Sequence, residues 1–310
     1  MYDFTIPSDL SWRRFKIKKK TPGEFRQITA PNAELKDVQR NVLRYLESNR
    51  NLAPTAFAHG FVRFRNALSG AMRHDRKAYA MITIDVKDFF DTFPVSVVKE
   101  RLLSTGMSDV LVDKILKLCV YENQLPQGGP CSPILTNIGM FICDKTLGGY
   151  ARNNGLRYSR YADDLTFSYP ATATKEEVEA TAKRHIAAIS GILEKECKLK
   201  INKKKIHVAR IDSPRTARIV TGIVIRNDGL GYNAPKRMRR KARAMCHKLA
   251  VKVMGQNGVF RDEDHVSMLR LVGYVRYFDY IRSGGEGEAA TADPKIQEKY
   301  WNYLTERWMK

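Results

Sequence analysis

Apolar residues recur at three- and four-residue steps in two parts of the chain, which is typical of helices with one buried face. The first part covers residues 34–47. The second begins at Thr174, which a glutamate follows three residues later as in a capping box, and its apolar stripe continues to Leu193. Further helices are expected over residues 95–121, 134–148 and 234–254.

Shorter runs predict strands. Residues 79–84 are mostly apolar and end at Asp85, which is typical of a buried strand. Residues 157–168 carry aromatic, hydroxyl and β-branched side chains on both sides of an acidic pair, which predicts two strands joined by a tight turn. Further short strands are expected over residues 25–29, 198–201 and 219–225. Glycines predict loops at residues 128–130 and 284–287, the latter before a short aromatic C-terminal helix.

The chain is strongly basic. Among its 310 residues, Lys and Arg number 54 against 33 Asp and Glu, a formal net charge of +21, while 43% of the residues are hydrophobic. The hydrophobic fraction and the length predict a globular protein with two or three subdomains. The charge predicts a polyanionic partner, and nucleic acid is favoured over an anionic membrane surface.

The positive charge is concentrated between residues 201 and 255, where 15 Lys or Arg stand against two Asp or Glu. A single basic helix can simply be a solvated face. A stretch of this length beside an acidic hairpin favours a surface that follows phosphates. The residues expected to bind nucleic acid are Lys236, Arg237, Arg239, Arg240 and Arg243.

Cysteine usage and the absence of targeting patterns bear on the compartment. The five cysteines are scattered without a Cys-x-x-Cys pair, which argues against a disulfide framework and a structural zinc. We expect them to be small core residues in a reducing compartment. The chain shows no apolar run of spanning length, no lipidation signal and no signal-peptide pattern, so we expect a cytoplasmic protein without a membrane partner.

Three carboxylates are the main candidates for chemistry. Asp163 and Asp164 are adjacent at the predicted turn, where repulsion and desolvation are tolerable if a divalent cation neutralises them. Asp85 closes a buried strand, and a carboxylate there is costly unless it is paired. Each feature alone also fits an ordinary solvated turn. Together they favour a metal site.

Four segments resemble, in order and spacing, the polymerase motifs of reverse transcriptases. Residues 84–90, 125–133, 161–164 and 199–205 are similar to motifs A, B, C and D, and the Tyr-x-Asp-Asp tetrapeptide at 161–164 is the most specific. The resemblance spans about residues 20–230. It implies an α+β fold, a right-hand polymerase with fingers, a ferredoxin-like palm and a helical thumb.

The resemblance also implies domain boundaries. Residues 1–84 would form the N-terminal segment and fingers, residues 85–227 the palm with a fingers insertion at about 95–125, and residues 228–310 an RNA-binding thumb. Aromatic residues crowd the last part, mostly as expected thumb core, with one or two able to stack on bases. They are Tyr274, Tyr277, Phe278, Tyr280, Trp301, Tyr303 and Trp308.

The implied catalytic residues are the three carboxylates. Asp85, Asp163 and Asp164 would bind two Mg²⁺ ions, with Mn²⁺ as an alternative, because Mg²⁺ demands hard oxygen ligands and two ions can serve both the attacking and the leaving oxygen.

Five further residues are implied around the incoming dNTP. Arg26 would contact the triphosphate, since arginine pairs bidentately with phosphate oxygens. Phe90 would lie under the sugar and exclude a 2′-hydroxyl. Gln127 and Gly128 would lie against the nucleotide, because a residue without Cβ lets the backbone approach closely. Lys205 would face the pyrophosphate, with two neighbouring lysines as competitors. A surface arginine, a core phenylalanine and a simple glycine turn are the ordinary alternatives.

A Val-Thr-Gly triplet at residues 220–222 and the short chain resemble bacterial retron reverse transcriptases. Such an enzyme would take a structured noncoding RNA as template and primer and start DNA synthesis from the 2′-hydroxyl of a guanosine. Its product would be a branched RNA–DNA molecule, msDNA. An associated effector protein and a role in antiphage defence are further implications.

One element departs from the retron pattern. Retron enzymes carry Asn-Ala-x-x-His between fingers and palm, whereas Asn66 and Ala67 lack that histidine and the nearest one is His74.

Two other interpretations stay open. A reverse transcriptase of another bacterial group, diversity-generating or group II intron-like, would share the four motifs, but the triplet and the chain length favour the retron type. A noncatalytic RNA-binding scaffold would keep the fold without activity. Loss of any of the three aspartates would favour the scaffold, and none is lost.

Overall fold

A four-stranded antiparallel sheet organises the computed structural model, which describes residues 4–18, 23–213, 216–255 and 262–285. Its strands are β3 (Ala80–Asp85), β4 (Arg157–Tyr161), β5 (Asp164–Ser168) and β6 (His207–Arg210), in the order β4-β5-β3-β6. Helices connect β3 to β4 and β5 to β6, so the chain order is β-α-β-β-α-β. This is the ferredoxin-like arrangement expected for the palm.

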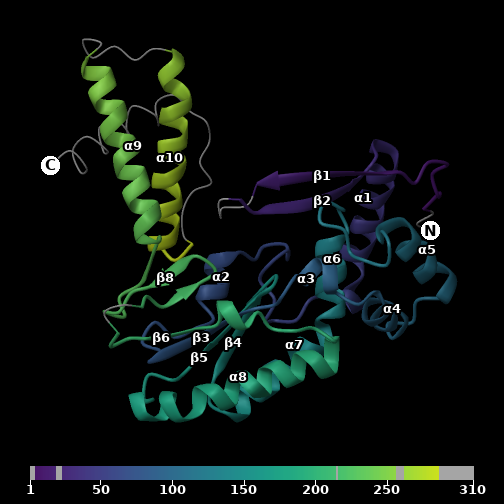
Figure 1. Ribbon diagram of the computed structural model, residues 1–310, viewed down its shortest axis with the longest axis horizontal. Helices are drawn as coiled ribbons and strands as arrows, with labels where there is room; N and C mark the ends of the chain where they lie inside the picture. The colour runs from purple at the N-terminus through teal and green to yellow at the C-terminus, as the bar shows by residue number, and fades with distance from the viewer. Residues whose placement is uncertain (1–3, 19–22, 214–215, 256–261, 286–310) are drawn as a thin grey trace.

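Helices cover one face of this sheet (Figure 1). They are α6 (Ser132–Gly139), α7 (Phe141–Asn153) and the long α8 (Lys175–Cys197). Thr174 caps α8 by accepting from the Glu177 amide at 3.2 Å, as the capping box predicts. In β3, Ile82 and Ile84 are buried in the large core and Met81 in a second core, which explains why this strand is apolar on both faces.

The N-terminal elements form a separate group beside the sheet (Figure 1). A hairpin of β1 (Trp12–Lys18) and β2 (Phe25–Pro31) leads into α1 (Ala33–Ser48). Behind it pack α4 (Val95–Leu103) and α5 (Asp109–Cys119), the two halves of the predicted 95–121 helix, separated by a turn in which Gly106 has φ +86°. Short elements η1 (Arg50–Leu52) and α3 (Phe89–Thr92) complete this part, whereas α2 (Ala67–Ala71) packs between β4 and the small C-terminal sheet.

The C-terminal part is a helical pair on a small sheet (Figure 1). The strands are β7 (Ile219–Val220), β8 (Ile223–Ile225) and β9 (Tyr232–Asn233), and the helices are α9 (Lys236–Met254) and α10 (Asp262–Arg282). Phe278 is buried in the second core, and Tyr274, Tyr277 and Tyr280 are partly buried against it, as expected for thumb core. Trp301, Tyr303 and Trp308 lie outside the described residues.

Several predicted elements differ from the structure. Residues 198–201 are not a strand: Lys198 ends α8 with φ 56°, Ile201 makes a single bridge to Val86, and a short helix η2 (Lys203–Lys205) follows. The edge position beside β3 is occupied by β6 instead. The Val-Thr-Gly triplet is a hairpin, because Thr221 and Gly222 have φ 48° and 83° and form a two-residue turn between β7 and β8.

Predicted helix 134–148 is also wrong in detail, since α6 and α7 meet at Met140. The five cysteines are all buried and free, which confirms them as core residues.

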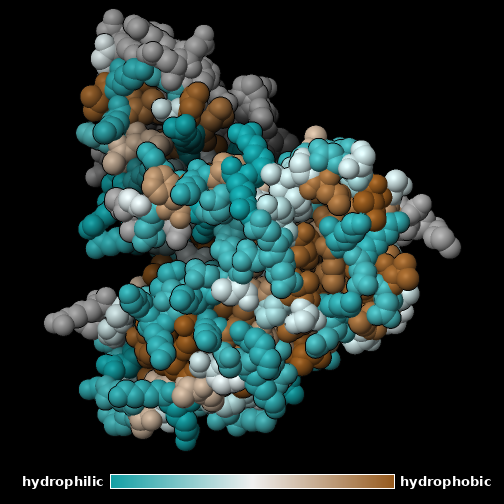
Figure 2. All heavy atoms as spheres, turned by 45° about the vertical axis from the view of Figure 1, so that its right-hand side comes forward, coloured by the Kyte–Doolittle hydropathy of each residue, from teal (hydrophilic) through white to brown (hydrophobic). Residues whose placement is uncertain are grey.

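Hydrophilic side chains cover much of the face shown in Figure 2. None of the helices in the described ranges is long and apolar enough to cross a membrane.

Candidate active site

The acidic pair lies at the turn of the β4–β5 hairpin, as predicted. Ala162 turns the chain with φ 54°, and Tyr161 pairs with Asp164 across the hairpin. Asp85, the last residue of β3, lies directly opposite Asp164 in the antiparallel register, which places their Cα atoms about 4.5–5.5 Å apart. The Val86 amide donates to the Asp163 carbonyl at 3.0 Å. The fold therefore brings the three predicted carboxylates to one end of the sheet.

The electrostatics of this end favour a cation. Burial raises the pKa of Asp163, and the charge of Asp85 raises it further. Burial, followed by the charges of Asp163 and Asp85, raises the pKa of Asp164 to about 6. Lys205 opposes both shifts. The protein alone therefore neutralises the negative charge of these carboxylates incompletely, which is common for side chains that bind a metal ion.

Lys205 partly fills the role of a cation. Its Nζ lies 3.1 and 3.0 Å from the two carboxylate oxygens of Asp85, and this hydrogen bond raises the pKa of Lys205. Asn202 Nδ2 donates to the same carboxylate at 3.2 Å. Within the described ranges, no three His, Cys, Asp or Glu side chains already converge as a metal cluster. The hard oxygen donors and the ammonium that compensates them nevertheless fit a divalent cation.

Phe90 and Arg26, two of the residues predicted to contact dNTP, lie at this end of the palm by different contacts. The Phe90 ring is half-buried, with its centroid 6.0 Å from that of Phe61, and the Phe61 ring centroid lies 6.5 Å from that of Tyr161 in the β4–β5 hairpin. Arg26 is exposed on β2. It is close enough for its charge to lower the pKa of Asp163, against the larger effect of burial.

The other two predicted residues, Gln127 and Gly128, contact protein. The Thr29 amide of β2 donates to the Gln127 carbonyl at 2.9 Å. Gly128 has φ +132°, and a Cβ there would lie 2.8 Å from the Thr29 carbonyl oxygen. Gly128 therefore lets its loop approach strand β2 closely, and its contact with the nucleotide stays a prediction. The Gln127 amide donates to both Asp91 oxygens, at 3.2 and 3.1 Å.

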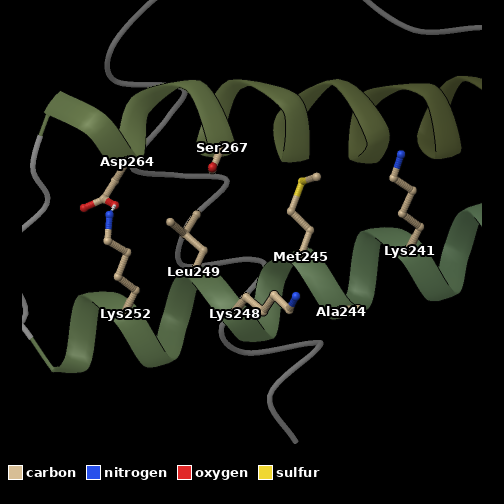
Figure 3. Close-up of a pocket in the computed structure, with 8 residues that line it drawn as sticks. All are labelled: Lys241, Ala244, Met245, Lys248, Leu249, Lys252, Asp264 and Ser267. Carbon is tan, nitrogen blue, oxygen red and sulfur yellow. Dashed lines mark ion pairs between the residues drawn. The ribbon is translucent and has the colours of Figure 1, made fainter.

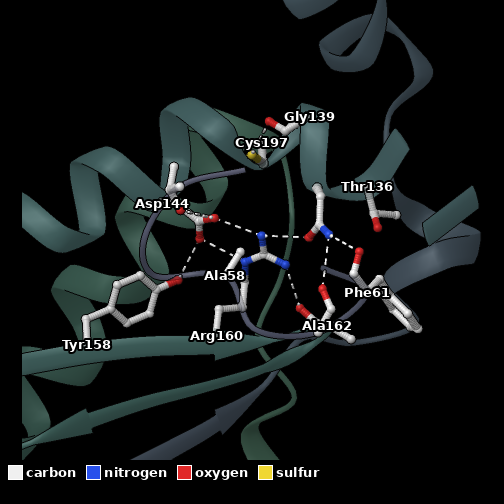
Figure 4. Close-up of polar contacts among 12 residues, drawn as sticks. Ala58, Phe61, Thr136, Gly139, Asp144, Tyr158, Arg160, Ala162 and Cys197 are labelled. Carbon is white, nitrogen blue, oxygen red and sulfur yellow. Dashed lines mark hydrogen bonds and ion pairs between the residues drawn. The ribbon is translucent and has the colours of Figure 1, made fainter. Parts of the chain in front are cut away.

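Behind the β4–β5 turn lies a buried polar network that is not evident from the sequence (Figure 4). Arg160 donates from Nε and Nη2 to the two Asp144 oxygens, each at 2.8 Å, and from Nη1 to the Ala162 carbonyl at 3.1 Å. The Tyr158 and Thr55 hydroxyls also donate to Asp144, at 2.9 and 3.1 Å. Although burial lowers it, the pKa of Arg160 is raised overall by the Asp144 charge. The ion pair thus holds the residue that precedes Asp163.

His74, the histidine nearest to the divergent element, joins the two strands of the β4–β5 hairpin. It is buried, and its ring nitrogens lie 2.8 Å from the hydroxyls of Ser168 on β5 and Ser159 on β4. Residues 70–74 read Gly-Ala-x-x-His and keep the Ala-x-x-His spacing of the retron element, with glycine at its first position. Asn66 instead caps α2 and donates to the Tyr280 hydroxyl at 2.8 Å.

We expect His74 to make the fold sensitive to acid. Burial lowers its pKa to about 3, so protonation favours the unfolded chain, whose histidines titrate at about 6.5. The stability it contributes is complete above pH 6.5 and is lost as the pH falls toward 3, at up to about 1.4 kcal/mol per pH unit. Urea unfolding between pH 7.5 and 5 should show a flatter pH dependence for His74→Gln than for the wild type. The exposed-histidine control His207→Gln should keep the wild-type slope, and equal slopes in all three proteins would contradict the assignment.

The predicted nucleic-acid residues lie at the start of α9. Lys236, Arg237, Arg240 and Arg243 are exposed, whereas Arg239 is half-buried and donates from Nε to the Ala234 carbonyl at 3.2 Å.

Farther along, α9 and α10 enclose a groove of about 340 Å³ (Figure 3). At one end Lys252 pairs with Asp264 at 2.7 Å. The groove is lined by Lys241, Ala244, Met245, Lys248, Leu249, Lys252, Asp264 and Ser267. All of these residues are on the helical pair, away from the catalytic hairpin.

A family model of reverse transcriptases, the RNA-dependent DNA polymerases, matches residues 17–257. The chain belongs to this family. It is similar to the Escherichia coli retron Ec86 reverse transcriptase, with 34% identity over 94% of this chain and 83% of that protein. It is also similar to the Myxococcus xanthus retron Mx65 reverse transcriptase, with 32% identity over 76% of this chain and 55% of that protein.

Solved structures agree on the fold. Telomerase from Candida albicans, in complex with a fragment of telomeric RNA, is 9% identical and has a TM-score of 0.54, covering 97% of this chain and 67% of that one. Apo telomerase from Candida tropicalis is 15% identical with a TM-score of 0.51, covering 72% and 55%. At such low identity these structures confirm the right-hand polymerase fold alone.

The family and its relatives confirm the main functional prediction. The reverse transcriptase is of the retron type and performs RNA-templated DNA synthesis, so an RNA template is its partner. Its family depends on divalent metal. The noncatalytic scaffold is therefore not supported. Retron relatives likewise favour this type over the diversity-generating and intron-like groups.

Proposed function

We propose that this reverse transcriptase converts a structured noncoding RNA into branched msDNA, with Asp85, Asp163 and Asp164 as the carboxylates that bind two Mg²⁺ ions. The observation that carries the metal assignment is the register of the sheet, which sets Asp85 opposite Asp164 while Asp163 occupies the adjoining turn. Phosphoryl transfer mainly requires positioning and neutralisation of charge.

The residues of the chain divide this work. A pair of divalent cations held by the three carboxylates would activate the attacking hydroxyl and stabilise the leaving pyrophosphate. The hydrogen bond from Asn202 holds the Asp85 carboxylate in place. The hydrogen bond from Arg160 to the Ala162 carbonyl holds the turn in place. Arg26, on the exposed hairpin that faces these carboxylates, would bind the triphosphate oxygens. Lys205 would leave Asp85 for the pyrophosphate.

The remaining predictions complete the proposal. Residues 1–84 act as N-terminal segment and fingers, 85–227 as palm and 228–310 as thumb. The exposed basic residues at the start of α9 hold the RNA or the hybrid, because duplex RNA is contacted mainly through its backbone and shape. An effector protein and antiphage defence follow from the retron type by analogy alone.

Nucleic acid that copurifies with the protein tests the proposed product. Expressed with its neighbouring genomic sequence, the wild type should retain a DNA strand joined through a 2′–5′ bond to a guanosine of an RNA. Sequencing after debranching should reveal both strands. Linear cDNA without a branch, made by an active polymerase, would refute the msDNA assignment while leaving DNA synthesis intact.

Phe90→Val should admit ribonucleotides. The Phe90 ring is linked to Tyr161 of the β4–β5 hairpin through Phe61, and removal of its bulk would open space for a 2′-hydroxyl. We expect the preference for dCTP over CTP, measured as the ratio of kcat/KM values, to fall by about 100-fold, since steric exclusion of one hydroxyl contributes a few kcal/mol. Phe89→Val, which alters the neighbouring buried ring, is the matched control. An unchanged ratio in Phe90→Val would refute the gate role.

A further inference from the structure

An exposed aromatic ring projects from the loop formed by residues 60–65, which packs against the β4–β5 turn. Phe64 is 92% exposed, the highest value among the large apolar side chains of the described residues. Burial of this ring against a base would remove apolar surface from water, which favours a stacking contact. We propose that Phe64 stacks on a nucleobase of the RNA template or DNA primer close to the catalytic carboxylates.

The loop is attached directly to the catalytic turn. Its first residue, Gly60, packs so closely that a Cβ there would lie 2.5 Å from the Ala162 amide nitrogen. Asn137 accepts a hydrogen bond from Arg160 Nη2 at 3.0 Å and donates to the Gly60 carbonyl at 3.0 Å. The next ring, Phe61, lies 6.0 Å from Phe90. Phe64 follows three residues later, so its Cα is within about 11 Å of that of Phe61.

The loop is also held in one conformation. Phe61 and Phe64 have φ values of 57° and 62°, a left-handed backbone that non-glycine residues rarely adopt. Arg65 Nη1 donates to the Thr55 and Ala58 carbonyls at 2.6 and 2.7 Å and anchors the far end. A fixed ring loses little conformational entropy when it binds, which suits a stacking contact.

The surroundings of the ring favour nucleic acid over protein. Arg63 lies over the Phe64 ring with its Cζ 5.0 Å from the centroid, and Arg65 follows in the chain. An exposed aromatic ring with an arginine guanidinium beside it matches a base and its phosphate. A protein partner would require a broader apolar patch depleted of charge. The inference rests on the proposed function, because this loop is near substrate only if the adjoining hairpin is catalytic.

The test measures stacking without chemistry. An RNA template annealed to a DNA primer carries 2-aminopurine at one of the first three unpaired template positions or at the primer terminus, in Ca²⁺ without dNTPs. With the full-length wild type, at least one position should be quenched. Phe64→Ala should lose that quenching and weaken affinity about ten-fold, because one stacked base contributes at this scale. Phe64→Trp should restore both signals and Phe64→Leu should not.

Val110→Ala, at a site 80% exposed on α5, is the control and should bind as the wild type does. Wild-type quenching and affinity in Phe64→Ala would overturn the proposal. So would unchanged nucleic-acid binding with loss of a protein partner, which would assign the ring to a protein interface. Primer extension by the wild type with Mg²⁺ is scored separately. Failure of extension alone would therefore refute the proposed function and not the stacking contact.

Discussion

Asp163→Asn should abolish DNA synthesis, lowering the rate of primer extension by about a thousand-fold or more, because the loss of one metal-binding carboxylate removes several kcal/mol of transition-state stabilisation. The fold should not suffer. Asp163 and Asp164 repel each other at a partly buried turn, and the Asp163 charge helps to raise the pKa of Asp164 to about 6. Removing that charge relieves repulsion in the absence of metal.

The decisive pattern is therefore a split between activity and stability. Urea unfolding without divalent cations should give Asp163→Asn a free energy of unfolding equal to or above that of the wild type. Affinity for the RNA should be unchanged. Asp113→Asn, which removes an exposed carboxylate on α5, is the control and should retain full activity. Substantial extension by Asp163→Asn, or an inactive variant that is also unfolded, would contradict the assigned role.

Asp144→Asn should destabilise the palm by about 3–5 kcal/mol, because it leaves the Arg160 guanidinium buried without its counter-charge. Both side chains are almost wholly inaccessible, at 0% exposure for Arg160 and 1% for Asp144. The same network holds the Ala162 carbonyl at the catalytic turn. We therefore expect kcat to fall as well, even at temperatures where the variant is folded.

The exposed ion pair Lys99–Asp113 is the comparison for the loss of stability in Asp144→Asn. Disrupting Lys99–Asp113 by Asp113→Asn should leave the free energy of unfolding nearly unchanged, since both partners are solvent-exposed. The double variant Asp144→Leu with Arg160→Met should recover part of the stability lost in Asp144→Asn, because it leaves no unpaired charge. If Asp144→Asn unfolds with the wild-type free energy, the ion pair does not hold the turn.

The sequence predicted the elements whose signals are local. The apolar run before Asp85 and the acidic hairpin became β3, β4 and β5, and the capping box at Thr174 marks the start of α8. The register that joins Asp85 to Asp164 also follows from these strands once they pair. The resemblance to the motifs of reverse transcriptases then implied the role of each site residue.

What the sequence left out depends on contacts between distant residues. In the sequence Arg160 is not distinguishable from the other basic residues. Its role depends on the ion pair with Asp144, sixteen positions earlier, which only the fold brings together. The glycine at 128 serves strand β2, about a hundred residues away in sequence. Residues 198–201 have strand-like composition, but β6 takes the edge beside β3. Helix α10 was missed although its buried residues recur at helical spacing, because exposed apolar residues such as Val266 and Leu269 blur the stripe.

The most direct test is the position of metal in a complex. Crystals of the full chain with an RNA template, a DNA primer ending in a dideoxynucleotide, the next dNTP and Mn²⁺ would locate the ions by anomalous scattering. We predict two peaks roughly 3.5–4 Å apart, both within bonding distance of carboxylate oxygens of Asp85 and the Asp163–Asp164 pair, with Lys205 released from Asp85. Peaks located elsewhere, with Lys205 still paired to Asp85, would contradict the account.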